Sequence, residues 1–286
     1  EVMELLTTPT VDSQDQQLIV TAMTIAGLRA FDITKFRIMA NVCRKASFLE
    51  VRQRALVGFV FTMGQGMSSL FPEQKAIVEE VLADKSIYSQ LLELQMQLVY
   101  CVKASDDSRK VQDEIMPGIV KNSDLQVKNG MIVEVEDNSI DDILGKNDDE
   151  QRAEEVERLM RNLKDLQDSG ADILFGGFSH MKRFPFFNDM ANWFLPFSTK
   201  NKYVREVVGA TGIELPYNSC FQKSGFCDND CYSFVFVFKE VIGRMPENIR
   251  EMFRNQVSVP DDDSVDTPTH YRRNYLQTMY RFFSLF

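Results

Sequence analysis

Apolar residues recur at helical spacing along the first third of the chain, and the pattern restarts at intervals. Ser13–Phe31 and Ile33–Ala46 are predicted as a pair of amphipathic helices, because their apolar positions fall at i, i+3, i+4 and i+7. The pattern begins again at Ser47 and at Ser86, a spacing of roughly 34–39 residues that is typical of helical solenoids. The pattern predicts an all-α protein: an α-solenoid of helix pairs followed by further packed helices.

Residues at the predicted helix boundaries agree with this pattern. Asp12 or Ser13 is placed to cap the first helix, and Asp32 separates it from the second. Gly64 follows the apolar run of the second unit and suits a helix end, because glycine tolerates the left-handed conformation found there. Pro72–Leu82 is predicted as the return helix, with proline in its first turn.

The unit that opens at Ser47 resembles HEAT repeats. The resemblance depends on Glu50-Val51-Arg52, followed by Ala55 and Leu56. In that family an arginine after an apolar residue ties neighbouring repeats together, so the resemblance implies a stacked helical array. The first and third units keep the helical spacing and lack the Val-Arg pair.

Residues 124–148 form an acidic segment between two apolar regions. The stretch LQVKNGMIVEV alternates apolar and polar residues around Asn129-Gly130, which indicates either a tight hairpin or an irregular loop. The stretch that follows, EVEDNSIDDILGKNDDE, is acidic and poor in apolar residues. It is predicted as a mobile linker, with a docking site for a basic partner as the alternative.

The region 149–286 is predicted to be helical as well. Pro185 and Pro196 divide an aromatic stretch into short helices joined by bends. The segment YSFVFVF is rich in residues that favour strands, but no partner strand is visible, so we expect a buried helix there. The predicted helices are Asp149–Asp168, Tyr203–Ala210, Asp230–Ile242, Glu247–Gln256 and a last one that begins near His270.

Two segments of this second half, FSHMKRFPFFNDMANWFLPF and YRRNYLQTMYRFFSLF, resemble segments of large bacterial tetratricopeptide-containing helical repeat proteins. The resemblance covers roughly residues 150–286. It implies a helical scaffold in which the tetratricopeptide array follows this chain, and it brings no catalytic residues. The expected organisation is therefore HEAT-like repeats over residues 1–123, an acidic linker over 124–148, and a helical region over 149–286 that leads into a further array.

Composition narrows the class of protein. The formal net charge of −10 argues against non-specific nucleic-acid binding, which needs a basic surface, although a local basic patch could be hidden in the total. The apolar runs are far shorter than the roughly 20 residues of a membrane helix. The start, EVMELLTTPT, does not resemble a signal peptide, and the absence of an initiator Met indicates a segment of a longer protein. A cytoplasmic location is expected.

Five cysteines are present, and three of them lie close together in the sequence. Cys43 and Cys101 fall in apolar helical stretches and are interpreted as core residues, which favours a reducing compartment. Cys220, Cys227 and Cys231 form a C-x6-C-x3-C cluster, which fits a zinc site only loosely. Possible fourth ligands are His180, His270, Asp228 and Asp230. The alternatives are a redox pair and thiols packed in a helical core, with Asp228 and Asn229 capping the next helix.

The sequence carries no signature of catalysis. The adjacent Ser179 and His180 would point in different directions, and His270 is interpreted as a helix-start residue. The paired carboxylates are interpreted as solvated caps or loop residues, and no phosphate-binding glycine motif occurs. The carboxylate pairs are Asp106-Asp107, Asp141-Asp142, Asp148-Asp149 and Asp261–Asp263.

Aromatic residues gather in two places in the second half. The stretch from Phe184 to Phe197 contains the only Trp, and we expect it to form core between short helices, with a partner-binding groove as the alternative. The last helix carries an apolar stripe that, if exposed, predicts self-association. The residues of the stripe are Tyr275, Met279, Phe282, Phe283 and Phe286.

The sequence thus predicts a non-enzymatic scaffold for protein–protein interaction, built from helical repeats, with an unidentified protein partner. Catalytic, cofactor-binding and metal-binding residues are not expected, and neither are nucleic-acid or membrane partners. The alternative is a helical enzyme or regulatory domain with a small-ligand or metal site near Cys220–Cys231 and His180. A third possibility is a structural spacer between domains.

Overall fold

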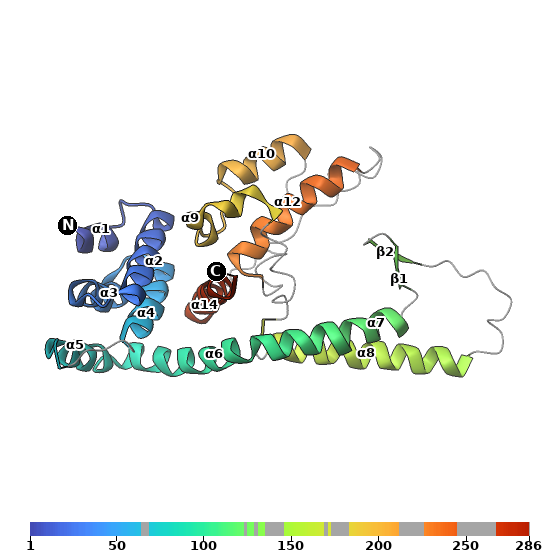
Figure 1. Ribbon diagram of the computed structural model, residues 1–286, viewed down its shortest axis with the longest axis horizontal. Helices are drawn as coiled ribbons and strands as arrows, with labels where there is room; N and C mark the ends of the chain where they lie inside the picture. The colour runs from blue at the N-terminus through green and yellow to red at the C-terminus, as the bar shows by residue number, and fades with distance from the viewer. Residues whose placement is uncertain are drawn as a thin grey trace. The chain divides into compact units, whose positions relative to one another are not determined.

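The computed structural model shows a helical protein with one short hairpin in the part that it describes (Figure 1). The described residues are 1–63, 69–122, 125–128, 131–134, 146–168, 171–172, 183–211, 226–244 and 267–285. The expectation of an all-α class is confirmed at this level. Within these ranges no helix combines the length and the apolar character that crossing a bilayer requires.

The elements follow one another along the chain in a fixed order. They are α1 (Val2–Thr7), α2 (Ser13–Arg29), α3 (Ile33–Lys45), α4 (Leu49–Met63), α5 (Glu73–Leu82), α6 (Lys85–Lys110), the π-helical segment η1 (Val111–Ile115), α7 (Met116–Asn122), β1 (Leu125–Lys128), β2 (Met131–Glu134), α8 (Lys146–Asp168), the 3-10 helix η4 (Pro185–Asn188), α9 (Met190–Trp193), α10 (Lys202–Thr211), α12 (Asp228–Arg244) and α14 (Pro268–Leu285).

The chain forms two compact units, and the first is discontinuous in sequence. The first unit comprises Glu1–Leu98 and Phe178–Phe286, and the second comprises Val99–Gly177. Helix α6 contributes residues to both. Residues 1–98 of the first predicted segment therefore share one unit with the described part of residues 178–286, whereas residues 99–122 and the described part of 149–177 belong to the other. The predicted three-part division at residues 123 and 148 stays a prediction.

Aspartates start the helices of the N-terminal region where the sequence places them. The side chain of Asp12 accepts a hydrogen bond from Gln14 N at 2.8 Å and begins α2. Asp32 caps α3 by accepting from the backbone of Thr34 at 2.8 Å and of Lys35 at 3.1 Å. These bonds satisfy amide donors that a helix leaves without partners at its N-terminus.

In the group of helices α2 to α5, the first helices of the two pairs are in contact with each other, and so are the second helices. Helix α2 contacts α4, and α3 contacts both α4 and α5. An ion pair of 2.5 Å between Arg44 and Glu80 joins α3 to α5. Fully buried apolar side chains fill the space between the helices, and they include Val20, Phe36, Met39, Val51, Leu56 and Phe59.

Two glycines set how closely α2 and α4 approach. A Cβ added at Gly27 of α2 would lie 2.6 Å from Cγ2 of Thr62 on α4. A Cβ added at Gly58 of α4 would clash with Oγ1 of Thr24 and lie 2.9 Å from Sδ of Met39. Native interiors are close-packed, so a larger side chain at either site would push the helices apart.

The third predicted unit is not a pair of helices. Helix α6, the π-helical segment η1 and α7 follow each other without a break from Lys85 to Asn122 (Figure 1). Asp106-Asp107, interpreted as a cap or loop pair, lies inside α6, because polar residues alone do not end a helix. The single-turn widening at Val111–Ile115 inserts the extra residue that a π segment carries.

Unit 2 is built on the packing of α8 against η1 and α7. Val111, Ile115 and Ile119 form a buried cluster with Leu159 of α8. Leu163 and Leu166 pack at its edge. The predicted helix Asp149–Asp168 is therefore part of α8, which buries Leu159 in this cluster and leaves Met160 52% exposed.

The segment between α7 and α8 contains a hairpin, which was one of the two alternatives that the sequence indicated. Strand β1 pairs with β2 antiparallel, with Lys128 opposite Met131 across Asn129-Gly130. The register leaves two residues for the connection, as expected for an Asn-Gly turn. Of the predicted linker 124–148, residues 124, 129–130 and 135–145 lie outside the described residues, as do the predicted helix Glu247–Gln256 and Gly64.

The last helix packs inside unit 1. Helix α14 contacts α4 and α12. Tyr275, Met279 and Phe282 of the predicted stripe are buried, and Phe283 is 50% exposed. The exposure on which the predicted self-association depends is therefore not met at those three residues, because helices far away in the sequence cover them. Phe286 lies outside the described residues.

Candidate functional site

Two of the three clustered cysteines lie at the start of α12. Cys227 directly precedes the helix and is fully buried, and Cys231 lies one turn further on, 6% exposed. Cys220 and His180 lie outside the described residues. His270 is the third residue of α14, in line with its interpretation as a helix-start residue.

An arginine occupies the polar space beside Cys227. Arg281 of α14, itself fully buried, donates to Oδ1 of Asp230 at 2.8 Å and to Sγ of Cys227 at 3.0 Å. The other oxygen of Asp230 accepts from the Cys227 backbone N–H at 3.0 Å, as the third residue of a helix does in a capping box. The carboxylate is therefore neutralised by a guanidinium, which opposes binding of a metal cation at the same atoms.

The described residues do not assemble a metal site. No group of three His, Cys, Asp or Glu side chains within the described ranges has a geometry that could hold a metal ion. Asp228, one of the possible fourth ligands, accepts from Phe197 N at 3.0 Å and lies 3.9 Å from Arg54. The zinc interpretation thus depends on Cys220 and His180 and stays a prediction.

Three of the four thiols that the structure describes are poor nucleophiles. Burial raises the pKa of Cys231 well above its ordinary range, and the neighbouring Asp228 raises it further. Burial raises the pKa values of Cys43 and of Cys101 to about 12. A thiol reacts as its thiolate, so these three cysteines fit the interpretation of packed core residues.

Buried arginines tie the N-terminal helices to the C-terminal ones within unit 1. The Arg54 guanidinium of α4 donates to the carbonyl of Phe194 at 2.8 Å and lies over the ring of Tyr275. Arg272 of α14 donates to Oε1 of Gln53 on α4 at 2.6 Å and forms an ion pair with Glu93 of α6. A buried polar group is costly unless its hydrogen bonds are made, so this network fixes how the helices meet.

The aromatic side chains of residues 184–197 are buried or half-buried. Trp193 is fully buried, and its Nε1 donates to the carbonyl of Phe187 at 2.8 Å. The Phe194 ring packs against Phe282 of α14 with ring centroids 4.9 Å apart. The expected core role is confirmed for these residues and for Phe184, Phe186 and Phe187, which are at most 8% exposed, although Phe184 and Phe186 also border open space.

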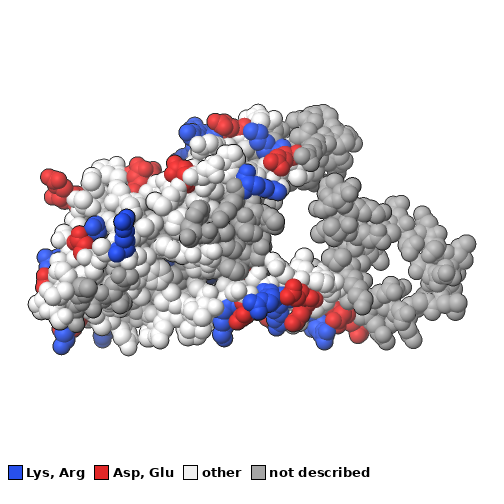
Figure 2. Space-filling model, viewed as in Figure 1, with Lys and Arg blue, Asp and Glu red and all other residues white. Residues whose placement is uncertain are grey.

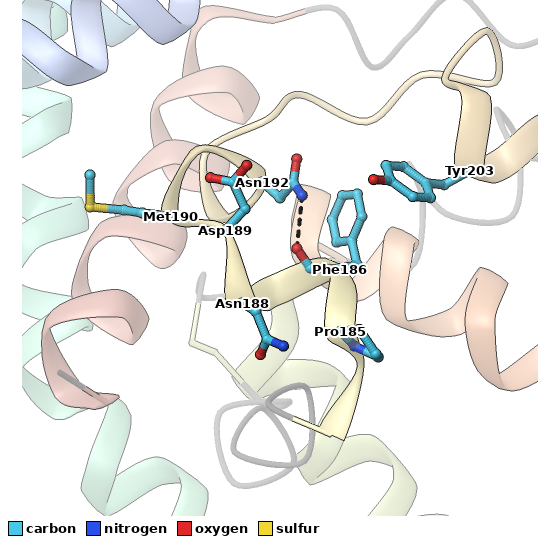
Figure 3. A pocket seen from close by; sticks show the side chains of 7 residues that line it. All are labelled: Pro185, Phe186, Asn188, Asp189, Met190, Asn192 and Tyr203. Atoms are coloured by element: carbon cyan, nitrogen blue, oxygen red, sulfur yellow. Dashed lines mark hydrogen bonds between the residues drawn. The ribbon is translucent and has the colours of Figure 1, made fainter.

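One hollow beside Phe186 is shown in Figure 3. It has a volume of about 600 Å³. The rings of Phe186 and Tyr203 meet edge to face with centroids 5.1 Å apart, and Nδ2 of Asn192 donates to the Phe186 carbonyl at 2.8 Å. Its lining residues are Pro185, Phe186, Asn188, Asp189, Met190, Asn192 and Tyr203.

A second hollow, of about 540 Å³, adjoins the first and shares Pro185, Phe186 and Tyr203 with it. We call the two together the aromatic groove. The ring of Phe236 on α12 lies 5.2 Å from that of Phe186 and 5.4 Å from that of Phe184. The lining residues of the second hollow are Phe184, Pro185, Phe186, Tyr203, Glu206, Val207, Phe236, Lys239 and Glu240.

Cations of the chain already lie over two rings of the groove. The guanidinium of Arg183 is 4.7 Å from the centre of the Phe184 ring, and the ammonium of Lys202 is 4.8 Å from that of Tyr203. The ring faces carry partial negative charge that attracts cations. The described surface in Figure 2 shows basic and acidic side chains interspersed, with no large area of one sign on that face.

Sequence reasoning found only one wall of this groove. It singled out Phe184 and Phe186, and it did not assign Tyr203, Phe236, Glu206 or Glu240 to a site. The usable signal was helical spacing: residues 203, 206 and 207 share one face of α10, and residues 236, 239 and 240 share one face of α12. Which helix faces meet is a tertiary property that this spacing does not contain.

Comparison with known proteins gives no further information about the site. No family model, no curated protein and no solved structure matches the chain.

Proposed function

We propose that the chain is a non-enzymatic, cytoplasmic helical scaffold that binds a protein partner through the aromatic groove. The observation that carries this proposal is the groove itself: two adjoining hollows whose shared wall is made of Pro185, Phe186 and Tyr203. Concave sites lined by apolar and aromatic side chains with a few polar groups are the usual form of binding sites.

The framework under the groove supports a preformed site. Phe186 and Phe187 are buried and meet edge to face with centroids 5.0 Å apart. The hydroxyl of Tyr232, beneath Phe186, donates to the Pro196 carbonyl at 2.9 Å. A wall held in this way loses little conformational freedom on binding, which favours affinity.

Two finer parts of the proposal concern family and repeat type. We propose that α2 to α5 form two stacked HEAT-like pairs, supported by the contacts of α2 with α4 and of α3 with α5. We also propose kinship with large tetratricopeptide-containing helical proteins, supported by the resemblance of residues 178–197 and 271–286. Neither part brings catalytic residues.

Selection of peptides from a displayed random library tests whether the groove binds proteins. We expect enriched peptides to bind the chain and to lose at least tenfold in affinity with Tyr203→Ala, which removes a wall of the groove. The matched control is Tyr88→Ala, which removes an exposed tyrosine of α6. Failure to enrich any peptide, or equal binding to Tyr203→Ala and the unmodified chain, would contradict the proposal.

A further inference from the structure

We infer that the partner segment bound in the aromatic groove is basic as well as apolar: one apolar side chain enters the second hollow, and a Lys or Arg beside it meets Glu206 and Glu240. This inference rests on the proposed function, because it names the chemistry of the ligand for the same groove.

The walls of the second hollow select an apolar side chain. Phe184, Phe186 and Val207 are 8%, 6% and 2% exposed, so their packed side chains form a fixed apolar floor. The hollow of about 540 Å³ exceeds the size of any single side chain. An aromatic or large aliphatic residue would displace water from this floor, which is the main favourable term for such an anchor.

Two carboxylates border the same hollow from opposite elements. Glu206 belongs to α10 and Glu240 to α12, and both are exposed. No ion pair joins either of them to another described residue, whereas an ion pair is present at several other exposed acids of the chain, such as Glu79 and Glu157. A cation placed in this hollow would therefore find carboxylates on both helices that border it.

Among the described residues that line the two hollows, one is basic, Lys239, and three are acidic, Asp189, Glu206 and Glu240. Asp189 already accepts from Ala191 N as the cap of α9. The faces of the Phe184 and Tyr203 rings are already occupied by Arg183 and Lys202, so the carboxylates of Glu206 and Glu240, and not these rings, would meet a partner's cation. A second copy of this chain is a poor occupant on charge, because each copy has a formal net charge of −10.

The test uses the displayed random library on the full chain and then measures the affinities of the enriched peptides. The decisive variant is Glu206→Lys/Glu240→Lys, which reverses both carboxylates. The control is Asp113→Lys/Glu114→Lys, which makes the same change of net charge at exposed positions of unit 2. This control separates a local effect from the general attraction of an acidic protein for basic peptides.

The expected result is enrichment of peptides with Lys or Arg next to an aromatic or large aliphatic residue. Their affinity should fall roughly 10- to 30-fold in the groove variant, remain within about twofold in the control, and weaken with added salt. Thermal unfolding at an unchanged temperature would show that the variant is folded, since both glutamates are exposed.

The other outcomes separate this inference from the proposed function. One such outcome is that the peptides need Tyr203 and yet bind equally well when the charges of both glutamates are reversed. That result would overturn the inference of a basic partner and would leave the groove as a binding site. The same conclusion follows if the control weakens binding as much as the groove variant does. Peptides that bind independently of Tyr203 would overturn both proposals.

Discussion

The guanidinium of Arg54 lies over the ring of Tyr275, with 4.5 Å between Cζ and the ring centre. The two residues belong to α4 and α14, so this contact joins helices from opposite ends of the sequence. Arg54 is 4% exposed, and burial lowers its pKa, while Tyr275 and Asp228 oppose that shift. The arginine is held as a cation inside a core, where its hydrogen bonds to carbonyl oxygens replace water.

Replacing Arg54 should destabilise unit 1 strongly. Arg54→Ala leaves the Phe194 carbonyl without its 2.8 Å donor and Asp228 without its cation. We expect a loss of about 3 kcal/mol in the free energy of unfolding, measured by urea denaturation. Arg109→Ala is the control, because Arg109 is exposed and pairs with Asp106 at 3.9 Å, and its loss should cost less than about 0.5 kcal/mol. An equal loss in the free energy of unfolding for the two variants would show that the Arg54 contacts stabilise unit 1 no more than an exposed ion pair does.

Enlarging Gly58 should force α4 away from α2 and α3. The added methyl of Gly58→Ala would overlap Oγ1 of Thr24 and approach Sδ of Met39 to 2.9 Å. We expect a destabilisation of about 1–3 kcal/mol, measured by thermal or urea unfolding. Gly209→Ala in α10 is the matched control, since nothing lies within 4 Å of its added Cβ, and it should stabilise by about 0.4–1 kcal/mol. A neutral Gly58→Ala would mean that the helices are free to separate.

The cap of α3 should make stability depend on pH. A hydrogen bond from the Lys35 side chain, with further bonds from the Lys35 and Thr34 amides, holds the pKa of Asp32 below its ordinary value. Because the folded pKa is lowered, the stabilisation is fully present above the unfolded value of about 3.9 and is lost as pH falls through the folded one.

Asp32→Ala should therefore cost about 1 kcal/mol at pH 7 and progressively less as the pH falls below about 4, by chemical denaturation at a series of pH values. Asp32→Asn separates the two contributions, because it retains an acceptor for the backbone amides and loses the charge. A difference between the unmodified chain and Asp32→Ala that does not change with pH would contradict the role of the carboxylate charge.

The buried thiols should resist alkylation in the folded protein. With a pKa of about 12, Cys43 and Cys101 have roughly a thousandth of the thiolate of an ordinary cysteine at pH 8. Peptide mapping after brief iodoacetamide treatment should show Cys43, Cys101 and Cys231 unmodified in buffer and modified in urea. Rapid native labelling of Cys231 would show that the start of α12 opens, and would revive the reactive-cysteine interpretation.

Self-association through the last helix would now depend on Phe283. It is the described residue of the predicted stripe that is half exposed, whereas Tyr275, Met279 and Phe282 are at most 9% exposed. If the chain self-associates by this helix, Phe283→Ser should shift the sedimentation coefficient toward that of the monomer at unchanged stability. An identical concentration dependence for both proteins would place any self-association elsewhere.

Local patterns predicted the helices well, because capping and periodicity act within a few residues. Asp12 and Asp32 begin helices as expected, and YSFVFVF is a helix because it packs on its neighbours in spite of residues that favour strands. The prediction of a third helix pair was wrong. Residues 105–110 are polar, and they continue α6 with most of their side chains exposed.

The site was only partly predictable for a different reason. Phe184 and Phe186 stand out in the sequence because aromatic residues crowd there, but Glu206 and Glu240 are ordinary exposed acids of two helices. Glu206 and Glu240 border the same hollow only because α10 packs on α12. The role of Arg281 was missed in the same way: it neutralises Asp230 across 51 positions of sequence.

The contact between Gln53 and Arg272 spans 219 positions. During synthesis, α4 therefore leaves the ribosome long before α14 exists to cover it, and chains grow at about 5–20 residues per second. For that interval of roughly ten seconds or more, the face of α4 that later receives Arg272 and Tyr275 is left to solvent or to a chaperone. Unit 1 is thus completed late in the synthesis of the chain, and premature termination of translation would leave the core of the N-terminal helices exposed.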